Sequence, residues 1–247
     1  MSNPAATADH LAGLQRSATT CDALPAALIP ADHDAAYAAQ DALIEHLDGE
    51  RVGYKIAATG PAAQQLLGVD APLWGQIVGP MVHDSPCTVS VADFASTPIV
   101  EAEIGLVIGP DGLSAVEARP IIELAASRFT NMAAVGSACT IADNIAATAF
   151  AVGPSVALDS LGDLSQLTAV ITVDGQEQAR GTGKAVLGSP INALAWLCEE
   201  LTARGRTLPP GSIISSGAVA IKRGMEAGQH IVADFGPLGQ VQVSTTA

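Results

Sequence analysis

Basic and aromatic residues are scarce in this chain of 247 residues, and their scarcity excludes several classes of partner. Lysine and arginine number 11 against 25 aspartates and glutamates, which gives a formal net charge of -14. Nucleic acids and anionic membranes are bound through clustered positive charge, so we expect neither as a partner. Aromatic residues make up 3% of the chain although 49% of it is hydrophobic. The core must therefore be built mainly from Ala, Val, Leu and Ile.

Membrane-spanning segments and cysteine-based sites are missing as well. No window of the sequence approaches about 18 consecutive apolar residues, and no apolar stretch follows a basic one at the N-terminus. The four cysteines are widely spaced and form neither a CxxC pair nor a Cys/His ligand pattern. These absences predict a cytoplasmic protein whose thiols are reduced and buried.

The beginning of the chain has the pattern of helices. Apolar spacing predicts a helix over residues 5–19 and a second helix that begins near Asp32 or Asp34 and ends at Gly49. We therefore expect residues 1–50 to form a helical N-terminal extension.

The rest of the chain, residues 51–247, has the pattern of short strands separated by Gly- and Pro-containing turns. Asp174-Gly175 predicts a β-hairpin, and Ser189-Pro190 predicts the start of a helix that extends through Arg204. The expected fold class is α+β, with a β-rich domain after the helical extension.

Two carboxylates interrupt an apolar run at residues 98–109, Pro-Ile-Val-Glu-Ala-Glu-Ile-Gly-Leu-Val-Ile-Gly. Strand side chains alternate between faces, so Glu101 and Glu103 point the same way. Ionised carboxylates in apolar surroundings are unfavourable unless they are neutralised, and Mg²⁺ prefers oxygen ligands of this kind. The run indicates a divalent-metal site. The alternative is an edge strand whose second face is solvated.

A lone lysine and a third carboxylate also lie inside apolar runs. Lys55 occurs in Gly53-Tyr-Lys-Ile-Ala-Ala-Thr, where burial predicts a lowered pKa and a role in proton transfer. The alternative is a lysine that extends to solvent from an ordinary strand. Glu123 occurs in Ile121-Ile-Glu-Leu-Ala-Ala-Ser-Arg-Phe.

Together these segments resemble the hydratase/decarboxylase branch of the fumarylacetoacetate hydrolase family, the group that contains 2-keto-4-pentenoate hydratases. The matching segments run in family order from about residue 35 to the C-terminus. They are Gly53-Tyr-Lys-Ile-Ala-Ala-Thr, Leu67-Gly-Val-Asp-Ala-Pro-Leu-Trp-Gly, Glu101-Ala-Glu103, Ile122-Glu-Leu-Ala-Ala-Ser-Arg-Phe, Ala142-Asp-Asn, Gly183-Lys-Ala-Val-Leu-Gly-Ser-Pro-Ile-Asn-Ala-Leu-Ala-Trp-Leu, Ser216-Gly217 and Ala233-Asp-Phe-Gly-Pro-Leu-Gly.

The resemblance implies a fold and a metal site. The fold is a twisted mixed β-sandwich or roll flanked by helices, with a metal-dependent catalytic domain at residues 51–247 and assembly into a homo-oligomer. Glu101, Glu103 and Glu123 would hold Mg²⁺ or Mn²⁺, and a 2-oxo acid would chelate the ion through a carboxylate oxygen and its keto oxygen. Lys55 would transfer a proton or stabilise the enolate.

The same resemblance places Leu73, Ser216 and Gly217 at the substrate. Three positions depart from the family pattern: Leu73 stands where relatives often carry an acid, Ala126 replaces an Asp, and Ala218 replaces a Ser or Thr. These departures favour a more apolar pocket, a different 2-oxo acid, or different chemistry on the same enolate.

The expected function is that of a carbon–oxygen lyase, a hydratase that adds water to an unsaturated 2-oxo acid of the 2-hydroxypenta-2,4-dienoate type, as in aromatic catabolism. The first alternative is a 2-oxo acid decarboxylase of the 4-oxalocrotonate type on the same scaffold. An acylpyruvate C–C hydrolase and a non-catalytic partner subunit rank below it. A complex with another enzyme of the pathway is left open.

Overall fold

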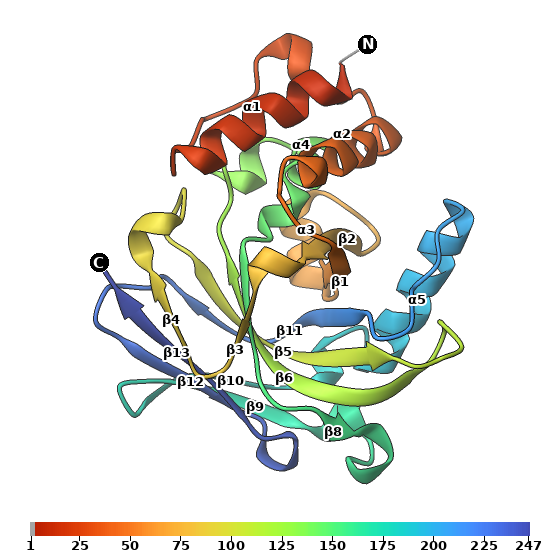
Figure 1. The fold of residues 1–247 in the computed structure, drawn as a ribbon, viewed down its shortest axis with the longest axis vertical. Helices are drawn as coiled ribbons and strands as arrows, with labels where there is room; N and C mark the ends of the chain where they lie inside the picture. Colours follow the sequence, from red (N-terminus) through yellow and green to blue (C-terminus); the bar gives the residue numbers. More distant parts are fainter. Residues whose placement is uncertain (1–2) are drawn as a thin grey trace.

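Two helices precede two β-sheets in the computed structural model, which describes residues 3–247 (Figure 1). Helix α1 (Pro4–Arg16) is capped by the side chain of Asn3, which accepts a hydrogen bond from the Ala5 amide. Helix α2 (His33–Glu45) is capped in the same way by Asp32, whose carboxylate accepts from the Ala35 amide at 2.8 Å. Both predicted helices are present, but the second ends before Gly49.

The larger sheet is mixed and contains the strands that carry the candidate site. Its strand order is β2-β1-β11-β5-β6-β7-β3, with β8 paired to β6. Strands β1 and β11 run parallel, whereas β5 runs antiparallel to both of its neighbours. The strands are β1 (Arg51–Ala57), β2 (Leu73–Val78), β3 (Val82–Asp84), β5 (Ile99–Ile108), β6 (Ala115–Ala125), β7 (Ala149–Val152), β8 (Val156–Ala157) and β11 (Ile213–Arg223).

The smaller sheet has the strand order β10-β9-β12-β13-β4. The predicted hairpin joins β9 to β10, and Asp174 and Gly175 at its turn have φ of 51° and 79°, as a tight two-residue turn requires. The strands are β4 (Cys87–Ser90), β9 (Thr168–Val173), β10 (Gln176–Thr182), β12 (His230–Asp234) and β13 (Gln240–Thr246).

The two sheets enclose the main hydrophobic core. The face of β5 that lies opposite the glutamates is completely buried, and its side chains share one cluster with Ile171 of β9 and Val241 of β13. This face carries Val100, Ala102, Ile104 and Leu106. Alternation along β5 thus separates an apolar face, which joins the sheets, from the face that carries the two glutamates. The expected twisted mixed β-sandwich flanked by helices is confirmed.

Three further helices complete the fold, α3 (Pro61–Leu67), α4 (Ser137–Ala142) and α5 (Pro190–Ala203). Helices α1, α2 and α4 lie together at one end of the molecule and share a second hydrophobic cluster that includes Leu11, Leu43 and Cys139 (Figure 1). The helices of residues 1–50 are thus packed against a helix from the rest of the chain. A domain boundary at residue 50 stays a prediction.

All four cysteines are free, as predicted, but Cys139 alone is buried and the other three are half-buried. The prediction of buried thiols is therefore wrong for three of the four cysteines. Among the described helices, none combines the length and hydrophobicity needed to cross a bilayer.

Candidate metal and active site

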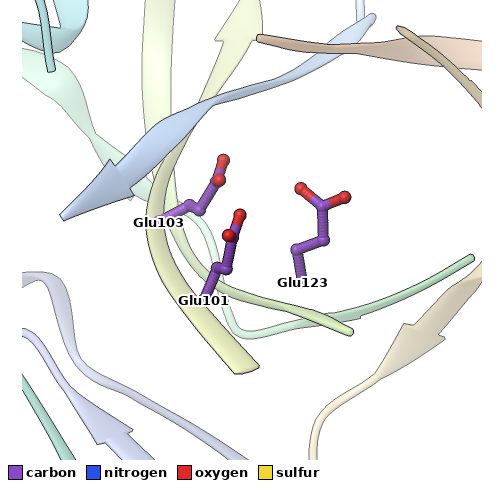
Figure 2. Close-up of side chains that lie close together, drawn as sticks. All are labelled: Glu101, Glu103 and Glu123. Atoms are coloured by element: carbon purple, nitrogen blue, oxygen red, sulfur yellow. The ribbon is translucent and has the colours of Figure 1, made fainter. Parts of the chain in front are cut away.

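Three glutamates from two neighbouring strands converge on one point. Glu101 and Glu103 lie on β5, and Glu123 lies on β6 directly opposite Glu101. Figure 2 shows the three side chains directing their carboxylates into a common space. One oxygen from each carboxylate lies within 4.8 Å of the others. Within residues 3–247, this is the one group of three or more His, Cys, Asp or Glu side chains spaced to share a metal ion.

The carboxylates are withdrawn from water, and their pKa values respond to burial. Glu103 is 1% exposed and Glu123 is 0% exposed. Burial, reinforced by the charge of Glu123, raises the pKa of Glu101 to about 7 and that of Glu103 well above its ordinary value. Burial also raises the pKa of Glu123, against the opposing attraction of Lys55. Each group therefore resists ionisation unless positive charge is supplied nearby.

Lys55 on β1 supplies one such charge. Its Nζ lies 2.9 Å from Oε1 of Glu123, and both side chains are buried. Burial is the largest single influence on the lysine and lowers its pKa, but attraction to Glu123, Glu101 and Glu103 together outweighs it and the pKa is raised. The prediction of a lowered pKa for Lys55 is therefore wrong, because three carboxylates face the ammonium group.

The donor set suits a hard divalent cation. All three side chains offer carboxylate oxygens, the ligands that Mg²⁺ and Mn²⁺ prefer. Both oxygens of Glu123 are buried without a well-formed hydrogen bond, even though Lys55 lies beside one of them. Buried oxygens with spare acceptor capacity, in a cluster with excess negative charge, fit a cation at this position.

Strand β11 orients one of these glutamates. Oε2 of Glu103 accepts hydrogen bonds from the Ser215 hydroxyl at 2.6 Å and from the Gly217 amide at 2.9 Å. The pairing of β11 with β5 shifts register between Ser215 and Ala218, so both donors reach the same oxygen. Hydrogen bonds of this kind hold a ligating carboxylate in one orientation.

Gly217 is required by this irregularity in the strand. Its φ is 118°, a backbone conformation that residues with a side chain rarely adopt, and an added Cβ would lie 2.7 Å from Oγ1 of Thr59. Sequence reasoning singled out Gly217 but missed Ser215. The hydroxyl of the predicted Ser216 donates instead to the Ile104 carbonyl at 2.7 Å. No local sequence signal distinguishes the two serines, because the register shift decides which one faces the carboxylates.

The remaining predicted positions lie around this centre. Leu73 is 3% exposed on β2, paired with Ala57 of β1, and Ala218 lies directly opposite Glu103. Ala126 is buried one residue beyond the end of β6. The substrate-binding roles assigned to Leu73, Ser216 and Gly217 stay predictions.

A turn with a strained backbone packs against β2, the strand that pairs with β1 and so lies next to the strand that carries Lys55. Asn144, Ile145 and Ala146 have φ of 51°, 51° and 60°, and each such residue costs roughly 1 kcal/mol. Asn144 holds the turn in place, since its side chain accepts from the Gln76 amide at 2.7 Å and donates to the Gln76 carbonyl at 2.9 Å. Sequence reasoning gave Asn144 no such role.

The turn also presses against Gly75, the partner of Lys55 in the β1–β2 ladder. A Cβ on Gly75 would lie 2.9 Å from the Asn144 carbonyl oxygen and 3.3 Å from Cγ of Lys55. Glycine at this position therefore leaves room for the Asn144 carbonyl and the Lys55 side chain, which a larger residue would displace.

Comparison with known proteins places this arrangement in a family. The model for the fumarylacetoacetate (FAA) hydrolase C-terminal domain matches residues 36–245. The chain belongs to the fumarylacetoacetate hydrolase family.

Relatives within this family carry two different activities in their names. A 2-keto-4-pentenoate hydratase of Paraburkholderia phymatum is 32% identical over 252 residues, which cover 96% of this chain and 95% of that protein. A 4-oxalocrotonate decarboxylase of Pseudomonas sp. is 30% identical and covers 79% of each chain. The structure of 4-oxalocrotonate decarboxylase from Pseudomonas putida G7, complexed with magnesium and adipate, has a TM-score of 0.90 at 25% identity and covers 98% of this chain and 97% of that one.

Proposed function

We propose that this chain is a carbon–oxygen lyase, a divalent-metal-dependent hydratase that adds water to an unsaturated 2-oxo acid of the 2-hydroxypenta-2,4-dienoate type. The observation that carries the proposal is the convergence of Glu101, Glu103 and Glu123 within reach of the buried Lys55. The similarity to a 2-keto-4-pentenoate hydratase over almost the whole chain supports the same activity.

Glu101, Glu103 and Glu123 would hold the cation, and Mg²⁺ is favoured because the similar decarboxylase structure contains magnesium. When bound, such an ion polarises the keto group of a 2-oxo acid and stabilises negative charge on its oxygen. The hydrogen bonds from Ser215 and Gly217 keep Glu103 directed at the centre of the cluster. Burial of Glu103 and Glu123 keeps bulk water away from two of the three carboxylates.

Lys55 is the side chain of this protein that would transfer the proton. The carboxylates keep its side chain protonated, so it is suited to donate a proton to the carbon chain or to stabilise an enolate oxygen. Its 2.9 Å contact with Glu123 holds the ammonium group next to the proposed metal ligands. We assign Lys55 as the catalytic residue on this basis.

Decarboxylation is the second candidate, and a specific finding favours it. The structural match to 4-oxalocrotonate decarboxylase extends over nearly the full length of both chains. When the carboxylate remote from the keto group of 4-oxalocrotonate leaves as CO₂, the electron pair of the broken C–C bond is delocalised through the double bond onto the keto oxygen. The resulting enolate needs the same stabilisation as the one in water addition, so the three glutamates and Lys55 would serve either reaction.

Product analysis separates the two reactions. Purified protein with Mg²⁺ is incubated separately with 2-hydroxypenta-2,4-dienoate and with 4-oxalocrotonate, and the products are identified by ¹H NMR. Hydration of the dienoate without CO₂ release from 4-oxalocrotonate is the expected result. CO₂ release alone would replace the proposal with the decarboxylase. No turnover of either substrate by metal-loaded protein would indicate a non-catalytic partner subunit.

We also propose that the enzyme is cytoplasmic, and that it assembles into a homo-oligomer as the family resemblance implies. Light scattering coupled to size exclusion tests the assembly, and a monomer at micromolar concentration would contradict it.

A further inference from the structure

One oxygen of Glu103 is occupied by hydrogen-bond donors of the protein itself. Its Oε2 accepts from the Ser215 hydroxyl at 2.6 Å and from the Gly217 amide at 2.9 Å. A carboxylate oxygen has about two lone-pair sites, so these two donors leave Oε2 without a site for a metal ion. Glu103 therefore presents a single oxygen, Oε1, to a cation in the cluster.

Burial makes this pairing hard to exchange. Ser215 is 0% exposed and Glu103 is 1% exposed, so bulk water does not replace either partner. The Gly217 amide is also buried, and it belongs to the backbone at the register shift of β11. Rotation of Glu103 to present both oxygens to an ion would leave a buried hydroxyl and a buried amide unpaired, which is unfavourable.

Glu123 differs from Glu103 in this respect, although both belong to the same cluster. Both oxygens of Glu123 are buried without a well-formed hydrogen bond, and Lys55 lies beside its Oε1. The restriction of Glu103 to one oxygen is therefore not a consequence of burial. It follows from the two donors that β11 supplies.

The number of oxygens that a carboxylate presents affects which ion a site prefers. Mg²⁺ is small and takes about six ligands in a nearly ideal octahedron, an arrangement that one oxygen from each carboxylate satisfies. Ca²⁺ is larger, takes roughly six to eight oxygens, and is often bound by both oxygens of one carboxylate. A glutamate that presents one oxygen thus suits Mg²⁺ and withholds a ligand from Ca²⁺.

We propose that Ser215 is a positioning residue that makes the site prefer Mg²⁺ to Ca²⁺, because its hydroxyl restricts Glu103 to one ligating oxygen. This inference rests on the proposed function, since it assumes that a divalent cation lies among the three glutamates. Without the hydroxyl, Oε2 keeps only the Gly217 donor and regains a lone pair, with which it can bind a larger ion.

The preference is measured on metal-free protein without substrate. Calorimetric titrations give the dissociation constants of Mg²⁺ and Ca²⁺ for wild-type protein and for Ser215→Ala. We expect wild-type protein to bind Mg²⁺ more tightly than Ca²⁺. Ser215→Ala should weaken Mg²⁺ binding without weakening Ca²⁺ binding, so the ratio of the two constants should fall at least about tenfold.

Two further variants identify the source of the change. Ser216→Ala removes the same hydroxyl from the adjacent and equally buried residue, which donates to the Ile104 carbonyl and not to Glu103. It should leave the ratio as in wild type. Ser215→Cys keeps a side chain of similar size with a weaker donor and should give an intermediate ratio. If Ser215→Ala does not fold, Ser215→Cys decides the question.

Failure of this inference is distinguishable from failure of the proposed function. If wild-type protein binds both ions equally, or if Ser215→Ala weakens both equally, Ser215 selects no ion and the inference is wrong while the metal site stands. The same conclusion follows if Ser216→Ala lowers the ratio as much as Ser215→Ala. If wild-type protein binds neither ion, the proposed function itself is wrong, and the inference falls with it.

Discussion

Glu101, which is half-buried, and the buried Glu103 and Glu123 make ionisation of one another less favourable, which opposes stability in the absence of a cation. Glu101 is the best position at which to test this mutual repulsion of the carboxylates. Lys55 forms its ion pair with Glu123, so a substitution at Glu101 leaves that ion pair intact. Glu101→Gln should raise the melting temperature of EDTA-treated protein by about 3 °C and weaken Mg²⁺ binding at least about tenfold. Thermal melting with EDTA and calorimetric titration with Mg²⁺ measure the two effects.

The opposite signs of these effects distinguish a metal ligand from a structural carboxylate. Glu117→Gln is a matched control, because Glu117 lies on β6 outside the cluster. Unchanged Mg²⁺ affinity in Glu101→Gln would contradict the assignment of Glu101 as a ligand.

We propose that Lys55 acts on the substrate and is not a ligand of the metal. Lys55→Met should retain Mg²⁺ binding and reduce turnover by about 10²- to 10⁴-fold, the usual contribution of a positioned proton donor. The exposed Lys184 provides the control, as Lys184→Met removes the same charge outside the cluster. Turnover by Lys55→Met close to that of wild type would remove the catalytic role of Lys55.

At the scale of elements, the register shift in β11 brings the Gly217 amide to Glu103, one of the proposed metal ligands. Gly217→Ala forces a Cβ to 2.7 Å from Thr59 in a backbone conformation with φ of 118°. We expect a loss of about 2–4 kcal/mol in the free energy of unfolding, together with weaker Mg²⁺ binding, because the Gly217 amide no longer holds Glu103. Denaturant unfolding and Mg²⁺ titration check both.

Gly228→Ala is the control for Gly217→Ala, because it introduces a side chain at a positive φ without a steric clash. Gly228 has φ of 83°, and an added Cβ there would contact nothing within 4 Å. It should therefore lose only about 1 kcal/mol of stability and keep its Mg²⁺ affinity. Equal effects of the two substitutions would show that the contact with Thr59 does not matter to the site.

The regular elements were predictable from the sequence because their causes are local. Alternation along β5 identified the shared face of Glu101 and Glu103, Asp32 marked the start of α2, and Asp174-Gly175 marked the hairpin. The family resemblance predicted the sandwich, and the family match and the two sheets confirm it.

Features that depend on distant segments were not predictable in this way. Sequence reasoning did not single out Ser215 as the side chain that contacts Glu103, because a register shift between two strands decides the orientation of Ser215 and Ser216. The raised pKa of Lys55 depends on how closely three carboxylates from other strands approach it. The strained turn at Asn144 is held by the backbone of a strand 68 residues away in sequence.

The stability of the whole molecule should depend on pH through the glutamate cluster. The pKa of Glu101 is raised from 4.5 to about 7 by burial and by Glu123, so the folded state holds a proton that the unfolded chain releases. A raised pKa means that this stabilisation is complete below about pH 4.5 and is lost as the pH rises through about 7. Metal-free protein should therefore lose stability over this interval, and added Mg²⁺ should restore it at the upper end.

Comparison with Glu101→Gln isolates this contribution from other titrating groups. The glutamine does not ionise, so the stability advantage of the variant in EDTA should grow between about pH 5 and about pH 8. Denaturant unfolding at several pH values measures the difference, and an advantage that is constant with pH would contradict the raised pKa.

Deuterium exchange at C3 of a simple 2-oxo acid in D₂O is the sharpest test of the proposed metal site and of Lys55, because it requires the carboxylate cluster and Lys55 but no particular reaction afterwards. Protein with Mg²⁺ and 2-oxobutyrate is followed by ¹H NMR, with EDTA-treated protein and Lys55→Met as comparisons. We expect loss of the C3 proton signal with Mg²⁺, no loss with EDTA, and little loss with Lys55→Met. Exchange at the same rate after complete removal of the metal would contradict this expectation.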